Sequence, residues 1–239
     1  MRVLVRPGCV VFLLSMALGG CRSGDDRTAP PGPVAQAIPA AKDSGVSRRT
    51  LLFVGTSITA GFGLDPALTW VSLVQRKIDS AGLPFRVSNA GVSGESSAGA
   101  LRRIEWLLAR EQKPSLVMIE TGANDGLRGQ LPDSVRANLE VIVRHIEAVS
   151  PMSVIVIAGM EALPNLGRRY ADRFRAIFPE VAAAHRAVYL PFLLAGVAGV
   201  DVLNQGDGIH PNPAGSERVA ANVWQTLRPI LDSLARSGH

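Results

Sequence analysis

The sequence contains few aromatic residues, and it has no clustered basic segment. Aromatic residues make up 5% of the 239 residues, too few for the stacking platforms on which proteins bind single-stranded nucleic acid. The Lys and Arg residues are scattered, so they form no stripe along which a phosphate backbone could lie. The net charge of +5 is therefore interpreted as a mildly basic surface, and no nucleic-acid partner is expected.

Cysteine is also scarce, which excludes a fold held by disulfides. The two cysteines, Cys9 and Cys21, both lie near the N-terminus, so no disulfide framework is expected in the rest of the chain. No group of His, Cys and carboxylate residues has the spacing of a metal site, and neither a metal nor a cofactor is predicted. The composition, with 47% hydrophobic and 19% charged residues, is that of a globular protein, and the length predicts one domain, or one domain with a tail.

Residues 1–20 have the features of a lipoprotein-type signal peptide rather than of a folded segment. Arg2 and Arg6 precede an apolar stretch of about ten residues, too short to span a bilayer as a helix. The stretch ends in Leu-Gly-Gly-Cys at residues 18–21, which resembles the lipobox of bacterial lipoproteins. We therefore expect lipidation of Cys21 and a membrane-anchored protein facing the periplasm or the cell exterior. The alternative is a plain secretory signal, with Cys21 incidental.

The composition changes twice after the signal. Residues 21–49 are rich in Pro, Ala and Gly and show neither helical nor strand periodicity, which predicts a flexible tether. Residues 50–239 alternate short apolar runs with amphipathic segments, and this part is predicted to be the folded domain.

The alternation in the folded domain predicts its architecture. Continuous apolar runs are typical of strands buried on both faces, and apolar residues in steps of three and four are typical of helices. The predicted strands are residues 51–54, 85–89, 116–119, 154–158 and 187–190. The predicted helices are residues 70–81, 98–110, 132–150 and 170–185, and a last helix with Val219, Val223, Leu227, Ile230 and Leu234 on one face. Together they predict a doubly wound, three-layer α/β/α sandwich with a mainly parallel five-stranded sheet.

Four polar segments lie where such a sheet places its active site, beyond the carboxyl ends of the strands. They are residues 55–58, 89–96, 122–125 and 207–212. They bring together a serine, amide donors and an Asp207/His210 pair. A serine hydroxyl attacks a carbonyl only when a base takes its proton, and the oxyanion needs preorganised donors. Alone, Ser57 could be a helix N-cap and Asn124 an Asx-turn residue, but their joint occurrence predicts acyl transfer.

These segments resemble those of the SGNH, or GDSL-type, hydrolases, and most of all the bacterial periplasmic thioesterase, lysophospholipase and arylesterase enzymes. The resemblance extends from residue 50 to about residue 231, and it includes the sequence Gly-Ala-Asn-Asp-Gly-Leu-Arg-Gly at residues 122–129. It implies the flavodoxin-like fold of that family and its serine esterase activity.

The resemblance also implies a role for each matching residue. Ser57 corresponds to the nucleophile, His210 to the general base and Asp207 to its partner. The oxyanion hole corresponds to the backbone N–H groups of Ser57 and Gly94 together with the side-chain amide of Asn124. No metal or other cofactor belongs to this set.

One position departs from the family pattern. The signature Gly-Asp-Ser of the family is Gly55-Thr56-Ser57 in this sequence. The Asp is not one of the four catalytic residues of the family, and a threonine can still offer its hydroxyl to a local hydrogen bond. Activity is therefore expected, with a change in local geometry and pH behaviour.

The expected substrate is a small acyl ester or thioester, such as an aryl ester, a short-chain acyl ester or a lysophospholipid, and the enzyme is expected to be a monomer. The apolar loop at residues 160–166 is either a wall for the acyl chain or a plain connector. Two alternatives remain open. One is a carbohydrate O-acetyl esterase that uses the same site, and the other is a non-catalytic lipoprotein that uses the cleft for binding.

Overall fold

The computed structural model of the chain describes residues 48–237. All five strands are parallel, in the order β2-β1-β3-β4-β5. This order is flavodoxin-like. The strands are β1 (Arg49–Gly55), β2 (Phe85–Gly91), β3 (Leu116–Ile119), β4 (Val154–Ala158) and β5 (Val188–Leu190). The predicted α/β fold is confirmed, and the sheet is entirely rather than mainly parallel.

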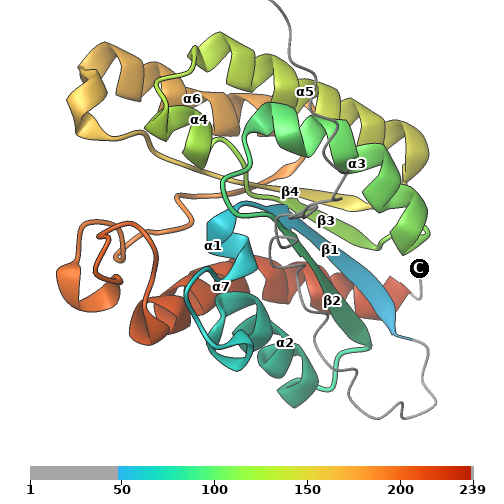
Figure 1. Cartoon of the computed structure of the whole chain (residues 1–239). Coiled ribbons are helices and arrows are strands. Elements are labelled where there is room, and N and C mark those ends of the chain that lie inside the picture. Colours follow the sequence, from blue (N-terminus) through green and yellow to red (C-terminus); the bar gives the residue numbers. More distant parts are fainter. Residues whose placement is uncertain (1–47, 238–239) are drawn as a thin grey trace, which may run out of the picture. The chain divides into compact units, whose positions relative to one another are not determined.

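Helices cover both faces of the sheet (Figure 1). The longer helices are α2 (Trp70–Ser80), α3 (Ser97–Glu111), α5 (Pro132–Val149), α6 (Arg168–Ala184) and α7 (Pro213–Ser237). Helices α3, α5 and α6 pack side by side on one face, and α2 and α7 pack together on the other. The two layers of helices enclose the sheet, as the alternation of strands and helices requires.

The core follows the predicted apolar runs. In β1, Leu51, Leu52, Phe53 and Val54 are each at most 1% exposed, because helices cover both faces of this central strand. The predicted stripe of α5 is buried as far as Ile146. Its last member, Val149, is exposed because the helix ends there.

The stripe of α7 differs in part from the prediction. Val219, Val223 and Leu227 are buried as expected, but the next buried residue is Leu231 rather than Ile230. Steps of four residues continue along the whole helix, close to its period of 3.6 residues. Ile230 and Leu234 lie at the margin of the stripe and are only partly buried against the core.

Two short helices were not predicted from the sequence. They are α1 (Ser57–Ala60) and α4 (Ala123–Leu127), and both are too short to show an apolar period. They follow β1 and β3, respectively, at the carboxyl ends of these strands. Strand β2 continues to Gly91, so residues 89–91, predicted as part of a polar loop, belong to the strand. These corrections all concern the carboxyl edge of the sheet.

The predictions for the N-terminus concern residues that the structure does not describe. The signal peptide at 1–20, the lipidated Cys21 and the tether as far as residue 47 lie outside the described residues. Within residues 48–237, no helix combines the length and the apolar character needed to cross a membrane.

Candidate active site

The predicted site residues gather at the carboxyl ends of β1, β2 and β3. Ser57 is the first residue of α1 after β1, Gly94 follows β2, and Asn124 is the second residue of α4 after β3. The Asp207/His210 segment precedes α7 and reaches the same place. In a sheet of this order, β1 and β3 border the point where the strand order reverses, which is where such folds bind ligands.

A continuous chain of hydrogen bonds joins the three predicted catalytic side chains. The distance between Ser57 Oγ and His210 Nε2 is 2.8 Å, and that between His210 Nδ1 and Asp207 Oδ2 is 2.6 Å. An ionised carboxylate only accepts hydrogen bonds, so Nδ1 carries the imidazole proton and Nε2 is free to accept the Ser57 proton. The arrangement has the geometry of a nucleophile, a general base and an orienting acid.

Asp207 is held in its ionised form by its own turn. Its Oδ1 accepts the backbone N–H groups of Ile209 and His210 at 2.9 and 3.0 Å. The backbone N–H of His210, followed by its side chain and the N–H of Ile209, lowers the pKa of Asp207 to about 2. The carboxylate therefore remains charged throughout the neutral range, where it can stabilise an imidazolium.

Two backbone N–H groups at the site are available for an oxyanion. Within residues 48–237, no protein acceptor binds the backbone N–H of Ser57 or of Gly94. Ser57 begins α1, whose first N–H groups have no acceptor within the helix. Gly94 has a φ of +77°, a conformation that disfavours any residue with a Cβ. Its carbonyl accepts a hydrogen bond from Arg128 Nη2 at 3.0 Å, which fixes the orientation of the loop.

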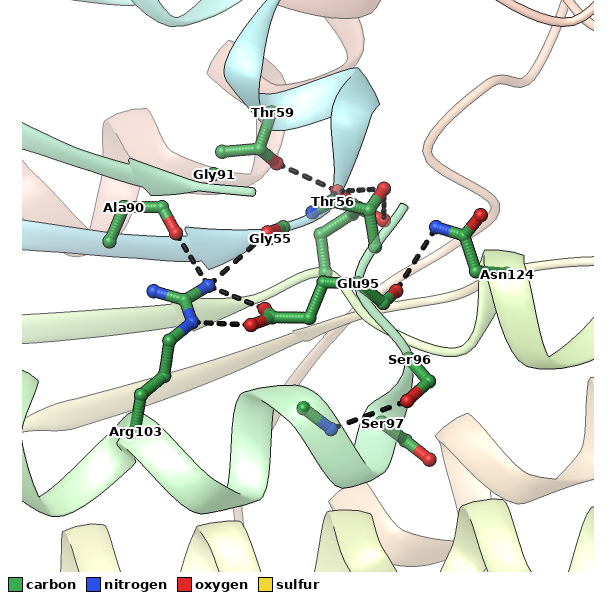
Figure 2. A network of polar contacts seen from close by, with 12 residues as sticks. Gly55, Thr56, Thr59, Ala90, Gly91, Glu95, Ser96, Ser97, Arg103 and Asn124 are labelled. Atoms are coloured by element: carbon green, nitrogen blue, oxygen red, sulfur yellow. Dashed lines mark hydrogen bonds and ion pairs between the residues drawn. The ribbon is translucent and has the colours of Figure 1, made fainter. Parts of the chain in front are cut away.

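Asn124 lies beside these groups and is tied to the same loop. Its Nδ2 donates to the carbonyl of Glu95 at 3.0 Å, as Figure 2 shows. This bond leaves the second hydrogen of the amide group free to reach a substrate. The side chain bonds to a distant segment and not to the backbone of its own turn, so the Asx-turn explanation does not describe it.

An ion pair and a set of buried hydrogen bonds around the site were missed by the sequence analysis. Arg103 of α3 binds both carboxylate oxygens of Glu95, at 2.6 and 2.7 Å, and also donates to the carbonyl of Ala90 at 2.7 Å (Figure 2). Asp125, only 4% exposed, accepts the backbone N–H and the hydroxyl of Ser97. These contacts fasten the loop of Gly94 and the helix of Asn124 to α3.

Phe62 is a further neighbour of the triad that the sequence analysis missed. Its ring lies 4.8 Å from the His210 ring, centroid to centroid, at an interplanar angle of 41°. The carbonyl of Phe62 accepts a hydrogen bond from Gln205 Nε2, and the backbone N–H of Gln205 donates to His210 O. The signal in the sequence was an aromatic residue five positions after Ser57, in the loop that follows α1.

His145 and His185 lie away from the predicted catalytic residues, and the apolar loop lies next to α4. His145 pairs with Glu105 and His185 with Glu147, each away from the triad in sequence and in contacts. Within residues 48–237, no three His, Cys or carboxylate residues gather as metal ligands. In the loop at 160–166, Ala162 packs against Gly126 of α4, so this loop lies next to the helix of Asn124.

Comparison with known proteins places the chain among acyl hydrolases. Residues 53–218 match the GDSL-like lipase/acylhydrolase family. Esterase TesA of Pseudomonas aeruginosa is 44% identical over 183 residues, which cover 77% of this chain and 90% of that protein. Thioesterase 1/protease 1/lysophospholipase L1 of Escherichia coli K12 is 33% identical over 183 residues, 77% of this chain and 85% of that protein.

A solved structure agrees with the sequence relatives. The psychrotrophic esterase EstA from a Pseudoalteromonas species, in a form inhibited by monoethylphosphonate, superimposes with a TM-score of 0.72. It is 32% identical, and the match covers 77% of this chain and 99% of that chain.

Proposed function

The chain belongs to the GDSL-like lipase/acylhydrolase family and hydrolyses acyl ester bonds, and from this premise we propose that Ser57, His210 and Asp207 perform the reaction. The observation that supports the assignment is the chain of hydrogen bonds at 2.8 and 2.6 Å from Ser57 through His210 to Asp207. The resemblance to the family gives the same three roles.

The first half of the proposed reaction transfers the acyl group to the enzyme. His210 Nε2 takes the Ser57 proton while Oγ attacks the carbonyl carbon, and a tetrahedral oxyanion forms. The imidazolium then gives this proton to the leaving alcohol or thiol, and the bond to the leaving group breaks. Asp207 stays ionised and stabilises the imidazolium.

The oxyanion is bound by three donors in this proposal. They are the backbone N–H groups of Ser57 and Gly94 and the side-chain amide of Asn124. The first two have no protein acceptor within residues 48–237, so they are available without breaking an existing bond. Donors that are already in place stabilise the transition state without reorganisation.

The second half of the reaction releases the acid. A water molecule gives a proton to His210 Nε2 as its oxygen attacks the acyl carbon of the ester on Ser57. The second tetrahedral intermediate collapses, Ser57 Oγ recovers the proton and the carboxylic acid leaves. The enzyme returns to its starting state, and no cofactor is consumed.

The proposed substrates are short-chain acyl esters, aryl esters, acyl thioesters and lysophospholipids. Apolar side chains are exposed on α4 and on the loops around the site, where they can contact an acyl chain or an aryl leaving group; they are Phe62, Val92, Leu127, Leu163 and Ile209. All reacting groups come from one chain, which is consistent with a monomeric enzyme.

A chain-length series of p-nitrophenyl esters, compared with acyl thioesters, lysophospholipids and acetylated sugars, tests this assignment. We expect kcat/KM to be higher for the aryl and acyl esters than for the sugars. A clear preference for acetylated sugars would instead identify a carbohydrate O-acetyl esterase. The inactive Ser57→Ala variant serves as the control for hydrolysis by contaminants.

For the N-terminal part, we propose a signal peptide at residues 1–20, a lipidated Cys21, a tether at 21–49 and a hydrolase domain at 50–239. The support is the Leu-Gly-Gly-Cys sequence at 18–21 and the change in composition after it. On this proposal the enzyme is exported, and its lipid anchor holds it at a membrane that faces the periplasm or the cell exterior.

A further inference from the structure

The carboxyl group of Glu120 has no part in the reaction described above, yet it is bound to residues on both sides of Ser57. Glu120 directly follows β3 and is 1% exposed. Its Oε2 accepts the backbone N–H of Thr56 at 2.7 Å and the hydroxyl of Thr59 at 2.9 Å. The Thr56 hydroxyl lies 2.9 Å from Oε1 and 3.0 Å from Oε2. Figure 2 shows Thr56 at the end of β1 and Thr59 on α1, and Ser57 lies between them in the sequence.

These contacts hold the start of a helix that has no side-chain cap of its own. Thr56 occupies the N-cap position of α1, but its side chain makes no capping bond to that helix. The turn is also packed tightly against the carboxyl group. A Cβ added at Gly55 would lie 2.7 Å from Glu120 Oε2 and 2.1 Å from Thr59 Oγ1. The carboxyl group thus supplies the contacts that hold this turn in place.

We propose that Glu120 is a positioning residue, which holds the Ser57 turn through Thr56 and Thr59 and holds it best when its carboxyl group is ionised. This inference rests on the proposed function, because it takes Ser57 to be the nucleophile. A small displacement of a nucleophile lowers the rate steeply, since the attacking atom must lie in a near-attack position.

The ionised form suits this role because every bound group can donate. A carboxylate accepts the N–H and both hydroxyls at once, whereas a protonated carboxyl must donate from one oxygen. The N–H of Thr56 cannot accept, so the added proton has to be donated to a threonine hydroxyl. The departure from the family signature therefore has a consequence. An aspartate at position 56 would place a second carboxylate against Glu120, whereas Thr56 supplies a hydroxyl donor.

Glu120 also titrates in the range where the enzyme is assayed. Burial raises the pKa of Glu120 to about 7, although the hydrogen bonds from Thr56 and Thr59 oppose the rise. The surrounding elements carry other charged or titratable groups, and none of those in residues 48–237 is hydrogen-bonded or ion-paired to Glu120. They are Arg103 and Glu95 on the α3 side, Asp125 on α4, and Asp207 and His210 before α7.

Protonation of Glu120 therefore lowers the activity on the acidic side, because Glu120 must be ionised to hold the turn. The value of kcat/KM reports on the free enzyme, and its ratio between the wild type and Glu120→Gln should fall as the pH is lowered through about 7. The titration of every other group is common to both proteins and cancels from this ratio. A residue that only stabilises the fold would leave the ratio independent of pH.

The first test is Glu120→Gln, which mimics the protonated form, because its NH2 can donate to Thr56 Oγ1 and its oxygen can accept the N–H of Thr56. At about pH 8.5 we expect kcat to fall by about 10- to 100-fold with KM within about twofold, and the difference in kcat/KM from the wild type to shrink as the pH is lowered through about 7. Glu111→Gln is the matched control. Glu111 is another largely covered carboxylate that accepts a serine hydroxyl, from Ser88, at the other end of α3.

A second pair of variants applies if Glu120→Gln does not fold. Thr56→Val removes one donor to the carboxylate while keeping the shape of the side chain, whereas Thr56→Ser keeps the hydroxyl. We expect Thr56→Val to raise, by about one unit, the pH at which kcat/KM begins to fall on the acidic side. We expect the profile of Thr56→Ser to match that of the wild type. Profiles of p-nitrophenyl ester hydrolysis are followed at the wavelength where nitrophenol and nitrophenolate absorb equally.

The outcomes separate this inference from the proposed function. An active Ser57→Ala variant overturns both. If Ser57→Ala is inactive but folded Glu120→Gln keeps its kcat within about twofold of the wild-type value at about pH 8.5, only the role of Glu120 is overturned. It is also overturned if the ratio of kcat/KM between the wild type and Glu120→Gln does not change with pH. The same conclusion follows if the Thr56→Val and Thr56→Ser profiles coincide.

Discussion

Replacing Glu120 by glutamine should lower the activity, but it should raise the free energy of unfolding relative to that of the wild type as the pH rises. A carboxyl group with a raised pKa keeps its proton in the folded state at pH values where the unfolded chain has released it. The folded state then binds more protons than the unfolded state, so stability decreases as the pH rises through that window. The side-chain amide of the Glu120→Gln variant carries no charge at any of these pH values, so the variant escapes this loss.

The magnitude follows from the pKa of Glu120, which burial raises from 4.5 to about 7. This displacement corresponds to about 3 kcal/mol when the carboxyl group is ionised in both states. The penalty is absent well below pH 4.5, grows between 4.5 and about 7, and is constant above that range. Between about pH 5 and 8, the free energy of unfolding of the wild type should fall by about 2–3 kcal/mol relative to that of Glu120→Gln.

Urea unfolding of both proteins at several pH values measures this difference directly. Every other titrating group is common to the two proteins, so its contribution cancels. Glu111→Gln controls for the loss of a carboxylate elsewhere. A difference between the wild type and Glu120→Gln that does not change with pH would contradict this prediction, because it would mean that Glu120 titrates in the folded state as it does in the unfolded chain.

Three further predictions concern the rest of the site and the N-terminus. Asn124→Ala should lower kcat by roughly 10²–10³, about 2.7–4 kcal/mol, with a much smaller change in KM. Asn124→Asp should be at least as harmful, and a folded, active Asn124→Asp variant would remove this residue from the oxyanion hole. Asp207→Asn should lower kcat by about 10²–10⁴ by disfavouring the productive tautomer of His210, and a near-normal kcat in this variant would contradict the role of Asp207. In the wild type, the titration of Asp207 should not change kcat/KM above about pH 4, because the pKa of Asp207 is about 2. Cys21→Ser should release the protein from the membrane fraction, and full retention there would disprove lipidation.

The sheet could be predicted from the sequence because its central strands are buried on both faces. Residues 51–54 and 116–119 are unbroken apolar runs, and the structure places both at the centre of the sheet. The positions of Ser57, Gly94, Asn124, Asp207 and His210 also followed from the polar segments and their resemblance to a family. In a parallel sheet, segments that follow strands meet at one edge whatever their separation in sequence.

The supporting contacts could not be predicted in the same way. Glu120 is 64 residues from Thr56, and no period or spacing connects them. The available signals were a charged residue at the end of the buried run 116–119 and the threonine in place of the signature aspartate. The ion pair of Arg103 and Glu95 could not be predicted either. Arg103 lies on α3 and Glu95 on the loop before it, and no sequence pattern shows that the guanidinium also binds the backbone carbonyl of Ala90.

Covalent labelling of the wild type and of Ser57→Ala by a fluorophosphonate probe tests whether Ser57 is the nucleophile. We expect the wild type to be labelled at Ser57. We expect Ser57→Ala, with an unchanged thermal melt, to lose both the label and essentially all esterase activity. Labelling or esterase activity that persists in folded Ser57→Ala would contradict this assignment.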